Sequence, residues 1–382
     1  MSETINTDLS INIGMVGPSG SGKTSLLTAI YHETQERIRD SKSGIQFWPA
    51  NEKTKKAMNR ALAAFRTCVS SPDGLFDVPE MKPSQEETNF WFDFMVPCPE
   101  LNNELQKVTI DIMDYPGGYV GSSEFRTKVF PHLEKSVALL VPVSTDMLMT
   151  YVENGNQNNP YLLKKRQLAL ETLDDSAVHV IIRQWIESRA GEYGALIFVP
   201  VKCEKWYNDN GGTIDAHQKV FNAISDLYKI NELIKADESN HIDIACFPVD
   251  TYGIVEFEGT ELETLPNGDE KLKSTFQRRD FGNEVKSLNA CEVLLSVIIS
   301  YLKNEAEHMG MSYEQLKKEI QGRTLLESLS KSFWELFGFA DKDKEKLGEY
   351  AQKHVTSYVA FDELTKRFRI LPQRQMNYKT AK

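Results

Sequence analysis

Eight residues near the N-terminus have the types and spacing of a phosphate-binding loop. Residues 17–24 read GPSGSGKT, a complete G-x-x-x-x-G-K-T motif whose backbone can approach an anion closely. Lys23 would reach the β- and γ-phosphates of a nucleoside triphosphate, and the Thr24 hydroxyl would bind Mg²⁺. The predicted nucleotide-binding residues of this segment are Gly17, Pro18, Ser19, Gly20, Ser21, Gly22, Lys23, Thr24 and Ser25.

The segments on either side of the loop give it the context that phosphate binding requires. Residues 11–16 are apolar and β-branched, as in a buried strand, and residues 25–31 have helical apolar spacing. A strand, a glycine loop and a helix together place several backbone N–H groups around one phosphate chain. The alternative, a Gly/Ser-rich turn that matches by chance, is disfavoured by this context.

A second acidic motif follows a later strand. Residues 107–113 (KVTIDIM) predict a strand, and Asp114 opens the D-x-x-G pattern DYPG directly after it. A carboxylate at this sheet edge lies where Mg²⁺ must be held. We prefer Asp114 to Asp111 as the metal ligand because Asp114 stands at the strand end. An ordinary Asp-Pro-Gly turn is the alternative. Gly117 would donate its N–H to the γ-phosphate, a contact that hydrolysis breaks.

Composition limits the other function classes. The chain has 382 residues, 41% of them hydrophobic and 26% charged, with a net charge of −11. The acidic balance argues against a general nucleic-acid binder. The five cysteines and seven histidines are scattered, without the spacing of a disulfide framework or a zinc site. No apolar run is long enough to cross a membrane and the N-terminus has no signal-peptide pattern, so we expect a cytoplasmic protein.

The order of elements predicts a doubly wound α/β fold. Apolar strands alternate with helical segments, and two strands form a hairpin, so the sheet should be mostly parallel with one antiparallel strand. We expect a domain over residues 8–305, with a helical insertion at about 41–80, and a C-terminal helical extension over residues 306–382. The predicted strands are 11–16, 88–96, 107–113, 137–144, 195–201 and 242–249, and the main predicted helices are 23–40, 51–68, 161–190, 213–236 and 288–303.

This order of motifs resembles the TRAFAC class of P-loop GTPases, and within it the bacterial double-GTPase-like domains. The resemblance implies a Mg²⁺-dependent molecular switch that binds and hydrolyses GTP. The class has a fourth motif, N/T-K-x-D, whose acid pairs with guanine. The matching residues are Val201-Lys202-Cys203-Glu204, in which Lys202 matches, Glu204 keeps a carboxylate and Val201 departs. The resemblance therefore favours GTP, while ATP stays open, and solvated charges at a strand end are the alternative for Lys202 and Glu204. Residues 248–251 weakly match the fifth motif.

Switch I of the class contains a hydroxyl that binds Mg²⁺. In this chain Ser84 is the preferred candidate, since Thr88 already begins a predicted strand. A plain polar loop is the alternative reading of this segment.

The sequence offers few residues for positioning the attacking water. Ras-like GTPases place a Gln after D-x-x-G, whereas this chain has Gly118 there. Glu124 in the predicted switch II helix (122–133) is a catalytic candidate, beside Arg126 and Lys128, together with Lys23 and Gly117. We expect slow intrinsic hydrolysis, assisted by a protein partner or a second subunit.

Other functions stay open at this stage. The chain could be an ATP-hydrolysing component of a larger assembly, including a bacterial defence system, or a nucleotide-binding module without turnover. An apolar stripe over residues 325–337 would pack on the nucleotide domain or its neighbours, and a surface for a partner or a membrane is the alternative. The tail beyond Glu363 carries basic residues and no acidic ones, which indicates a solvated terminus or contact with nucleic acid or anionic membrane.

Overall fold

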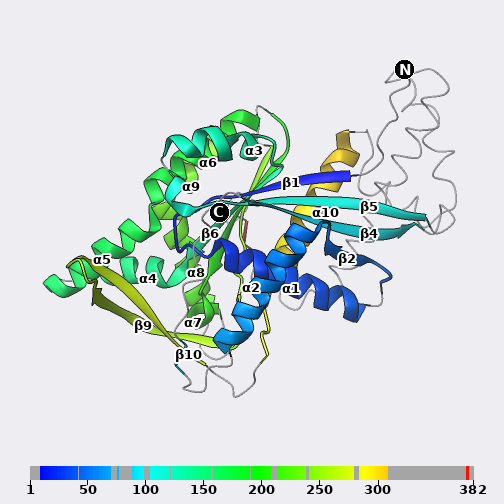
Figure 1. The fold of residues 1–382 in the computed structure, drawn as a ribbon. Helices are drawn as coiled ribbons and strands as arrows, with labels where there is room; N and C mark the ends of the chain where they lie inside the picture. The colour runs from blue at the N-terminus through cyan, green and yellow to red at the C-terminus, as the bar shows by residue number, and fades with distance from the viewer. Residues whose placement is uncertain are drawn as a thin grey trace.

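A mostly parallel sheet forms the centre of the molecule in the computed structural model (Figure 1). Within the described residues, eight strands are ordered β11-β8-β7-β6-β1-β5-β4-β2. β1 pairs parallel with β5 and β6, and β6, β7 and β8 continue in parallel. β4 is antiparallel to β5, and β2 and β11 add antiparallel edges. The strands are β1 (Leu9–Met15), β2 (Gln46–Pro49), β4 (Thr88–Cys98), β5 (Glu104–Asp114), β6 (Ala138–Ser144), β7 (Gly194–Val201), β8 (Ile242–Cys246) and β11 (Met376–Asn377).

Helices cover both faces of the sheet, with α1 and α10 on one face and α3 and α6 on the other (Figure 1). The predicted α/β class with an antiparallel hairpin strand is thereby confirmed. The helices are α1 (Lys23–Ser41), α2 (Glu52–Val69), α3 (Phe130–Glu134), α4 (Thr145–Glu153), α5 (Pro160–Leu173), α6 (Asp175–Arg189), α7 (Glu204–Tyr207), α8 (Ile214–Leu227), α9 (Ile230–Ala236) and α10 (Ala290–His308).

The structure describes only part of the chain, and the predicted C-terminal extension lies almost entirely outside it. The same holds for the predicted switch I segment. The described residues are 9–41, 43–69, 75–76, 88–98, 104–120, 122–155, 158–189, 191–207, 214–237, 241–278, 284–308 and 376–377.

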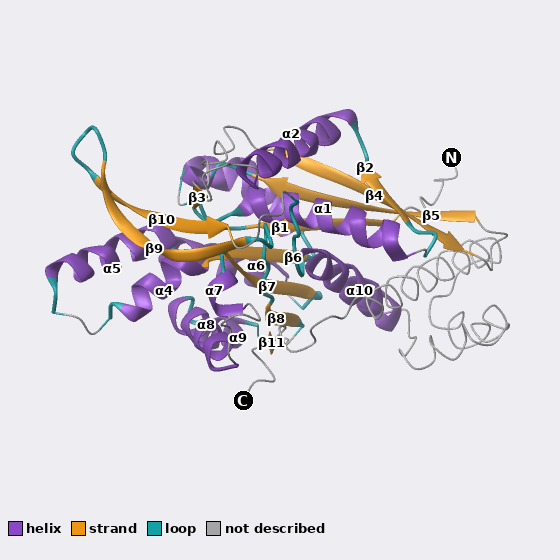
Figure 2. Cartoon of the chain, turned by 90° about the horizontal axis from the view of Figure 1, so that it is seen from below, coloured by secondary structure: helices purple, strands orange, loops and turns teal. Residues whose placement is uncertain are grey.

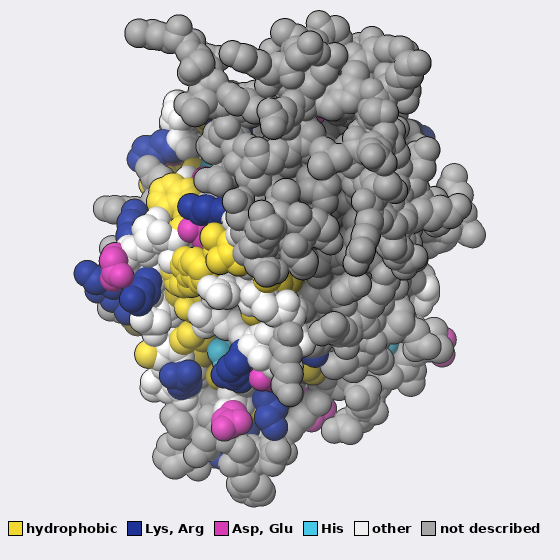
Figure 3. All heavy atoms as spheres, turned by 90° about the vertical axis from the view of Figure 1, so that its right-hand side faces the viewer, with side chains coloured by type: hydrophobic (Ala, Val, Ile, Leu, Met, Phe, Trp, Pro, Cys, Tyr) yellow, Lys and Arg dark blue, Asp and Glu magenta, His cyan; other side chains and the backbone are white. Residues whose placement is uncertain are grey.

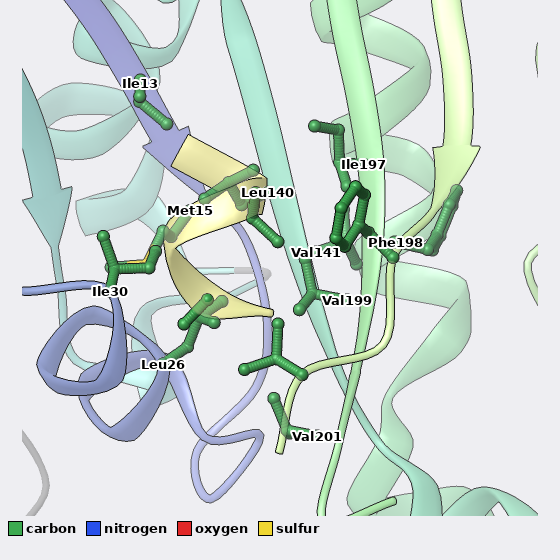
Figure 4. Close-up of a cluster of buried hydrophobic side chains, with 14 of the residues drawn as sticks. Ile13, Met15, Leu26, Ile30, Leu140, Val141, Ile197, Phe198, Val199 and Val201 are labelled. Atoms are coloured by element: carbon green, nitrogen blue, oxygen red, sulfur yellow. The ribbon is translucent and has the colours of Figure 1, made fainter. Parts of the chain in front are cut away.

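The apolar core fixes the start of α1 against the sheet. Every residue of β6 and β7 is buried, as in strands covered on both faces. Figure 4 shows Leu26 and Ile30 of α1 gathered with Met15 and with residues of β6 and β7, including Val201. Leu26, Ile30, Met15 and Val201 are each at most 1% exposed. The loop between β1 and α1 is therefore held between two packed elements.

A buried acid joins α1 to α10. Glu33 is 3% exposed, and its Oε2 accepts hydrogen bonds from the backbone N–H groups of Ala290 at 2.7 Å and Cys291 at 3.1 Å. Its Oε1 accepts from Arg37 on the same helix. Glu33 thus satisfies the first N–H groups of α10, which have no partner within their own helix.

Two long predicted helices are each divided in the structure. The 161–190 segment breaks at Asp174, which has φ +45°, and the 213–236 segment breaks at Lys229, with φ +51°. A left-handed residue ends a helix and redirects the chain. The predicted strand over 242–249 is shorter than expected, since β8 ends at Cys246.

A second sheet, absent from the sequence prediction, lies beside the central one (Figure 2). Its strands are β3 (Leu75–Phe76), β9 (Val255–Thr264) and β10 (Glu270–Arg278), ordered β3-β10-β9. We call the β9–β10 hairpin the ribbon. Its turn contains Asn267 and Gly268, with φ +88° at Gly268. The ribbon register shifts between Thr275 and Phe276, as at a β-bulge.

The surface in Figure 3 mixes basic and apolar side chains over its described part. Lys and Arg side chains border the apolar ones there, so the acidic excess of the sequence is not spread evenly over the described surface. No described helix is long and apolar enough to cross a membrane.

Candidate functional site

The structure requires glycine at three positions of the loop between β1 and α1, and the reason differs between them. Gly20 and Gly22 have φ +77° and +93°, a conformation that L side chains rarely adopt. Gly17 does not have a positive φ, although the sequence alone would allow this conformation at all three glycines. A Cβ at Gly17 would instead lie 2.6 Å from the Ser21 Oγ. The backbone conformation therefore favours glycine at positions 20 and 22. Position 17 requires glycine because a side chain would clash with Ser21.

Lys23 turns back into the loop. Its Nζ donates to the carbonyl oxygens of Gly17 at 2.6 Å and Pro18 at 2.9 Å, and the residue is only 6% exposed. Burial lowers the pKa of the Lys23 ammonium to about 8, and the nearby Asp114 carboxylate acts in the opposite direction. A desolvated ammonium in a glycine loop is suited to an anionic ligand that can replace these two carbonyls.

Thr24 and Asp114 meet at the mouth of the loop. Thr24 Oγ1 donates to Asp114 Oδ2 at 2.7 Å, although the two residues lie 90 positions apart. The parallel pairing of β1 with β5 brings them together, since Gly14 is in register with Met113. The rival acid Asp111 instead accepts from Asn89 of β4 at 3.3 Å.

The Thr24–Asp114 pair fits a magnesium ion by its donor chemistry. A hydroxyl and a carboxylate are hard oxygen ligands, and Mg²⁺ is usually held by one or two carboxylates together with substrate phosphates and water. Among the residues that the structure describes, no group of three or more His, Cys, Asp or Glu side chains could hold a metal by itself.

The segment after Asp114 packs directly onto the phosphate loop. A Cβ at Gly117 would lie 2.1 Å from the Ser19 backbone nitrogen. Tyr115, which is fully buried, accepts a hydrogen bond from the Gly17 N–H, and its ring centroid lies 5.2 Å from the Lys23 Nζ. The D-x-x-G motif that begins at Asp114 predicted a position for Gly117 beside the phosphate loop. It gave no indication of the Tyr115 contact.

The other catalytic and metal candidates lie elsewhere. Glu124 is fully exposed, and its carboxylate accepts from the Ser123 hydroxyl at 3.3 Å. It stands at the start of a helical segment that includes a π-helical turn (Phe125–Val129) and α3. Gly118 is also exposed. Ser84 lies outside the described residues, so the structure gives it no position.

A pocket of about 370 Å³, measured with its open mouth, lies beside the phosphate loop. It brings the loop together with both residues of the degenerate fourth motif and with the segment after β8. The ribbon adds one wall. The lining residues are Gly22, Ser25, Val201, Lys202, Glu204, Thr251, Tyr252, Val255 and Phe276.

Buried carboxyl groups surround Lys202 next to this pocket. Glu204, Asp146 and Asp250 are 2%, 0% and 4% exposed. Lys202 Nζ lies 3.7 Å from Asp146 Oδ2, and that carboxylate also accepts from Ser274 of the ribbon at 2.5 Å. Burial raises the pKa of Glu204 well above its ordinary value, and the charge of Asp250 adds to this effect.

Sequence reasoning missed the residues that reach the pocket from far along the chain. Phe276 and Ser274 belong to the ribbon, and Asp146 belongs to α4, which the sequence analysis did not predict. One signal was present for the ribbon: Asn267-Gly268 between two segments of alternating residues is typical of a hairpin.

Known proteins offer only distant similarity. No protein-family model and no curated protein matches the chain. One similar structure is the signal recognition particle receptor SRb-GTP/SRX complex from Chaetomium thermophilum, at 12% identity and a TM-score of 0.32 over 63% of this chain and 90% of that one. Another is Sup35 complexed with GDP, at 12% identity and a TM-score of 0.26 over 64% of this chain. This chain spans 38% of the Sup35 chain. Scores this low identify neither a family nor an activity.

Proposed function

We propose that this chain is a Mg²⁺-dependent GTP-binding protein that hydrolyses GTP slowly and acts as a switch on a protein partner. The observation that carries the proposal is the 2.7 Å contact between Thr24 and Asp114 at the mouth of a glycine loop that holds a buried lysine. Two motifs distant in sequence thereby supply the groups that a nucleoside triphosphate and its metal require.

The phosphates would bind in the loop. Lys23 would exchange the carbonyls of Gly17 and Pro18 for phosphate oxygens, and the free N–H groups at the start of α1 would donate to the same anion. Gly117, which lies against the loop backbone, would donate its N–H to the terminal phosphate.

Thr24 and Asp114 would hold the metal, with Ser84 as a further proposed ligand. When bound, Mg²⁺ neutralises phosphate charge. Asp114 is 1% exposed, so its carboxylate keeps one orientation towards the Thr24 hydroxyl.

The nucleobase would lie in the pocket beside Gly22. Glu204 lines this pocket, and its carboxylate would accept hydrogen bonds from N1–H and N2–H of guanine. Lys202 would cover the base with its aliphatic stem, and Phe276 and Val255 would supply apolar contact.

We expect slow hydrolysis because the residues proposed to lie near the terminal phosphate include no side chain suited to orient the attacking water. Gly118 has no side chain to orient water, and Glu124 is exposed to solvent. A partner protein or second subunit would supply the missing group, as GTPase-activating proteins do with an arginine.

Equilibrium binding tests the phosphate and metal sites. We expect fluorescent GTP to bind the full chain with Mg²⁺, and Lys23→Ala or Thr24→Ala to weaken binding by about tenfold or more, as for loss of a charged hydrogen bond of roughly 1.5–3 kcal/mol. Lys55→Ala, at an exposed lysine of α2, is the control and should bind normally. Equal affinity of Lys23→Ala and Lys55→Ala would contradict the proposal.

Base preference and turnover separate the alternatives. A preference for GTP over ATP that Glu204→Ala removes supports the assignment of the pocket. Preference for ATP at neutral pH would favour an ATPase acting in an assembly. Single-turnover hydrolysis by the isolated chain as fast as an activated GTPase would refute the slow-switch proposal, and complete absence of hydrolysis would favour a binding module.

A further inference from the structure

The pocket beside the phosphate loop has an excess of buried carboxyl groups. Glu204 lines the pocket, the carboxyl groups of Asp146 and Asp250 are close enough to act on it, and the Lys202 ammonium lies near Glu204 and Asp146. They come from four separate segments: α7, α4, the loop after β8 and the end of β7. Within the described residues, three carboxyl groups and one ammonium group lie close together, and an excess of buried like charge is unfavourable.

The Asp146 carboxyl group has both an ammonium partner and hydroxyl partners. It lies 3.7 Å from the Lys202 Nζ and accepts hydroxyl hydrogen bonds from Ser144 and Ser274, each at 2.5 Å. Asp250 Oδ1 accepts from the Gly253 N–H at 2.7 Å. Both aspartates thus have hydrogen-bond partners for their carboxyl oxygens.

The Glu204 carboxyl group differs from the two aspartates in its hydrogen bonding. It lines the pocket at 2% exposure, and within the described residues its Oε2 is buried without a hydrogen-bond partner. A buried polar atom in a native structure normally has a partner. An oxygen of this kind in the lining of an open pocket can accept its hydrogen bond from a ligand.

The hydrogen-bonding pattern of this carboxyl group depends on its proton. An ionised carboxylate only accepts, which complements the two donors N1–H and N2–H of guanine. A protonated carboxyl donates through its O–H and accepts through its carbonyl oxygen. That pattern complements adenine, whose N1 accepts and whose N6 amino group donates.

We propose that a proton on Glu204 determines which base the pocket accepts: the ionised side chain selects guanine and the protonated side chain selects adenine. This inference rests on the proposed nucleotide-binding function of the same site. The chain is then a purine nucleotide-binding protein whose choice between GTP and ATP follows pH.

The electrostatics of the pocket support this inference. Burial, and then the charges of Asp250 and Asp146, raise the pKa of Glu204, while Lys202 acts in the opposite direction. The Tyr252 phenol also lines the pocket. Since the pKa is raised, the change between the two forms lies above the ordinary carboxyl range, and acidification favours the adenine-binding form.

The test is the ratio of the dissociation constants of ATP and GTP, measured for the full chain with Mg²⁺ from about pH 5.5 to about pH 7.8. The ratio removes effects shared by the two triphosphates. We expect it to fall by up to about tenfold for each pH unit of acidification across the transition. Lys23 has a pKa of about 8, and any loss of its charge near the upper end of the range affects both triphosphates alike and cancels in the ratio.

Two variants separate a proton-dependent choice from a structural role. Glu204→Gln keeps the shape and fixes a neutral group that donates and accepts, so the ratio should favour ATP at every pH and lose its pH dependence. Asp250→Asn keeps the oxygen that accepts from Gly253 and removes one negative charge. It should move the transition to lower pH.

The outcomes are distinguishable from failure of the proposed function. A pH-independent ratio in the wild-type chain overturns the inference, as does an unchanged transition in Asp250→Asn when Glu204→Gln fails to fold. If neither nucleotide nor inorganic tripolyphosphate binds in a Lys23-dependent manner, the proposed function itself fails.

Discussion

The Tyr115 hydroxyl accepts a hydrogen bond from the backbone N–H of Gly17, 3.3 Å away and 98 positions earlier in the chain. The tyrosine ring is fully buried and meets Phe125 edge to face at 5.5 Å between centroids. One side chain therefore connects three segments: the phosphate loop, the turn after β5 and the helical segment that follows. Movement of that turn requires this contact to change.

Tyr115→Phe should destabilise the chain without removing nucleotide binding. The substitution keeps the ring packing but leaves a buried N–H without its partner, at a cost of about 1–3 kcal/mol. We expect the free energy of unfolding in urea to fall by this amount in the absence of nucleotide. Tyr228→Phe changes a buried tyrosine of the α8–α9 connection and should leave GTP affinity unchanged. A Tyr115→Phe chain as stable as wild type would mean that the contact contributes nothing.

Two adjacent glycines offer a matched test of the packing between the DYPGG turn and the loop. A Cβ at Gly117 would lie 2.1 Å from Ser19 N and 2.4 Å from Pro18 C, both backbone atoms, whereas a Cβ at Gly118 meets nothing within 4 Å. Gly117→Ala should prevent close packing and weaken GTP binding by about tenfold or more, the equivalent of roughly 1.4 kcal/mol. Gly118→Ala should bind as wild type. Equal affinities in a fluorescence titration would show that the turn does not contact the bound nucleotide.

Binding of a triphosphate should weaken in alkaline solution. Burial lowers the Lys23 pKa to about 8, so the lysine of the nucleotide-free chain loses its charge above that pH and must take up a proton to bind an anion. We expect the dissociation constant of inorganic tripolyphosphate to rise between about pH 7.5 and about pH 9.5, by up to about tenfold per unit above the pKa. Isothermal titration calorimetry measures this directly. Lys23→Met should give weak and pH-independent binding, and a flat wild-type profile would refute the prediction.

The Glu33 carboxyl group, which joins α1 to the start of α10, should make the free energy of unfolding depend on pH. Burial and then Glu292 raise the pKa of Glu33 to about 7, whereas the Cys291 N–H and Arg37 act in the opposite direction. A raised carboxyl pKa means that the folded state binds the proton more tightly. Its contribution to stability is therefore full below about pH 4.5 and lost as the pH rises through about 7.

Glu33→Gln removes this titration and keeps an oxygen to accept from the first N–H groups of α10. Its unfolding free energy should rise relative to wild type between about pH 5 and about pH 7.5. Urea denaturation at both pH values checks the sign. A variant that loses stability relative to wild type across this interval would contradict the assignment.

Local patterns predicted the sheet and the placement of Lys23, Thr24 and Asp114 at one edge of it. Parallel strands have their carboxyl ends at the same edge of a sheet, and the glycine loop is a contiguous motif. The divisions at Asp174 and Lys229 carry no Gly or Pro signal, because their left-handed conformation depends on how the flanking helices pack. The contact between Asp146 and Ser274 spans 128 positions, and no local pattern specifies such a distance.

The ribbon stands on a sheet of its own, yet Phe276 forms part of a pocket that begins at Gly22. The wall that would face a base and the loop that would hold its phosphates thus have separate scaffolds. Substitutions in the ribbon could accumulate without disturbing β1 or α1. Substitutions in this hairpin could therefore change the preferred nucleotide during evolution. The residues of the phosphate loop would meanwhile stay the same.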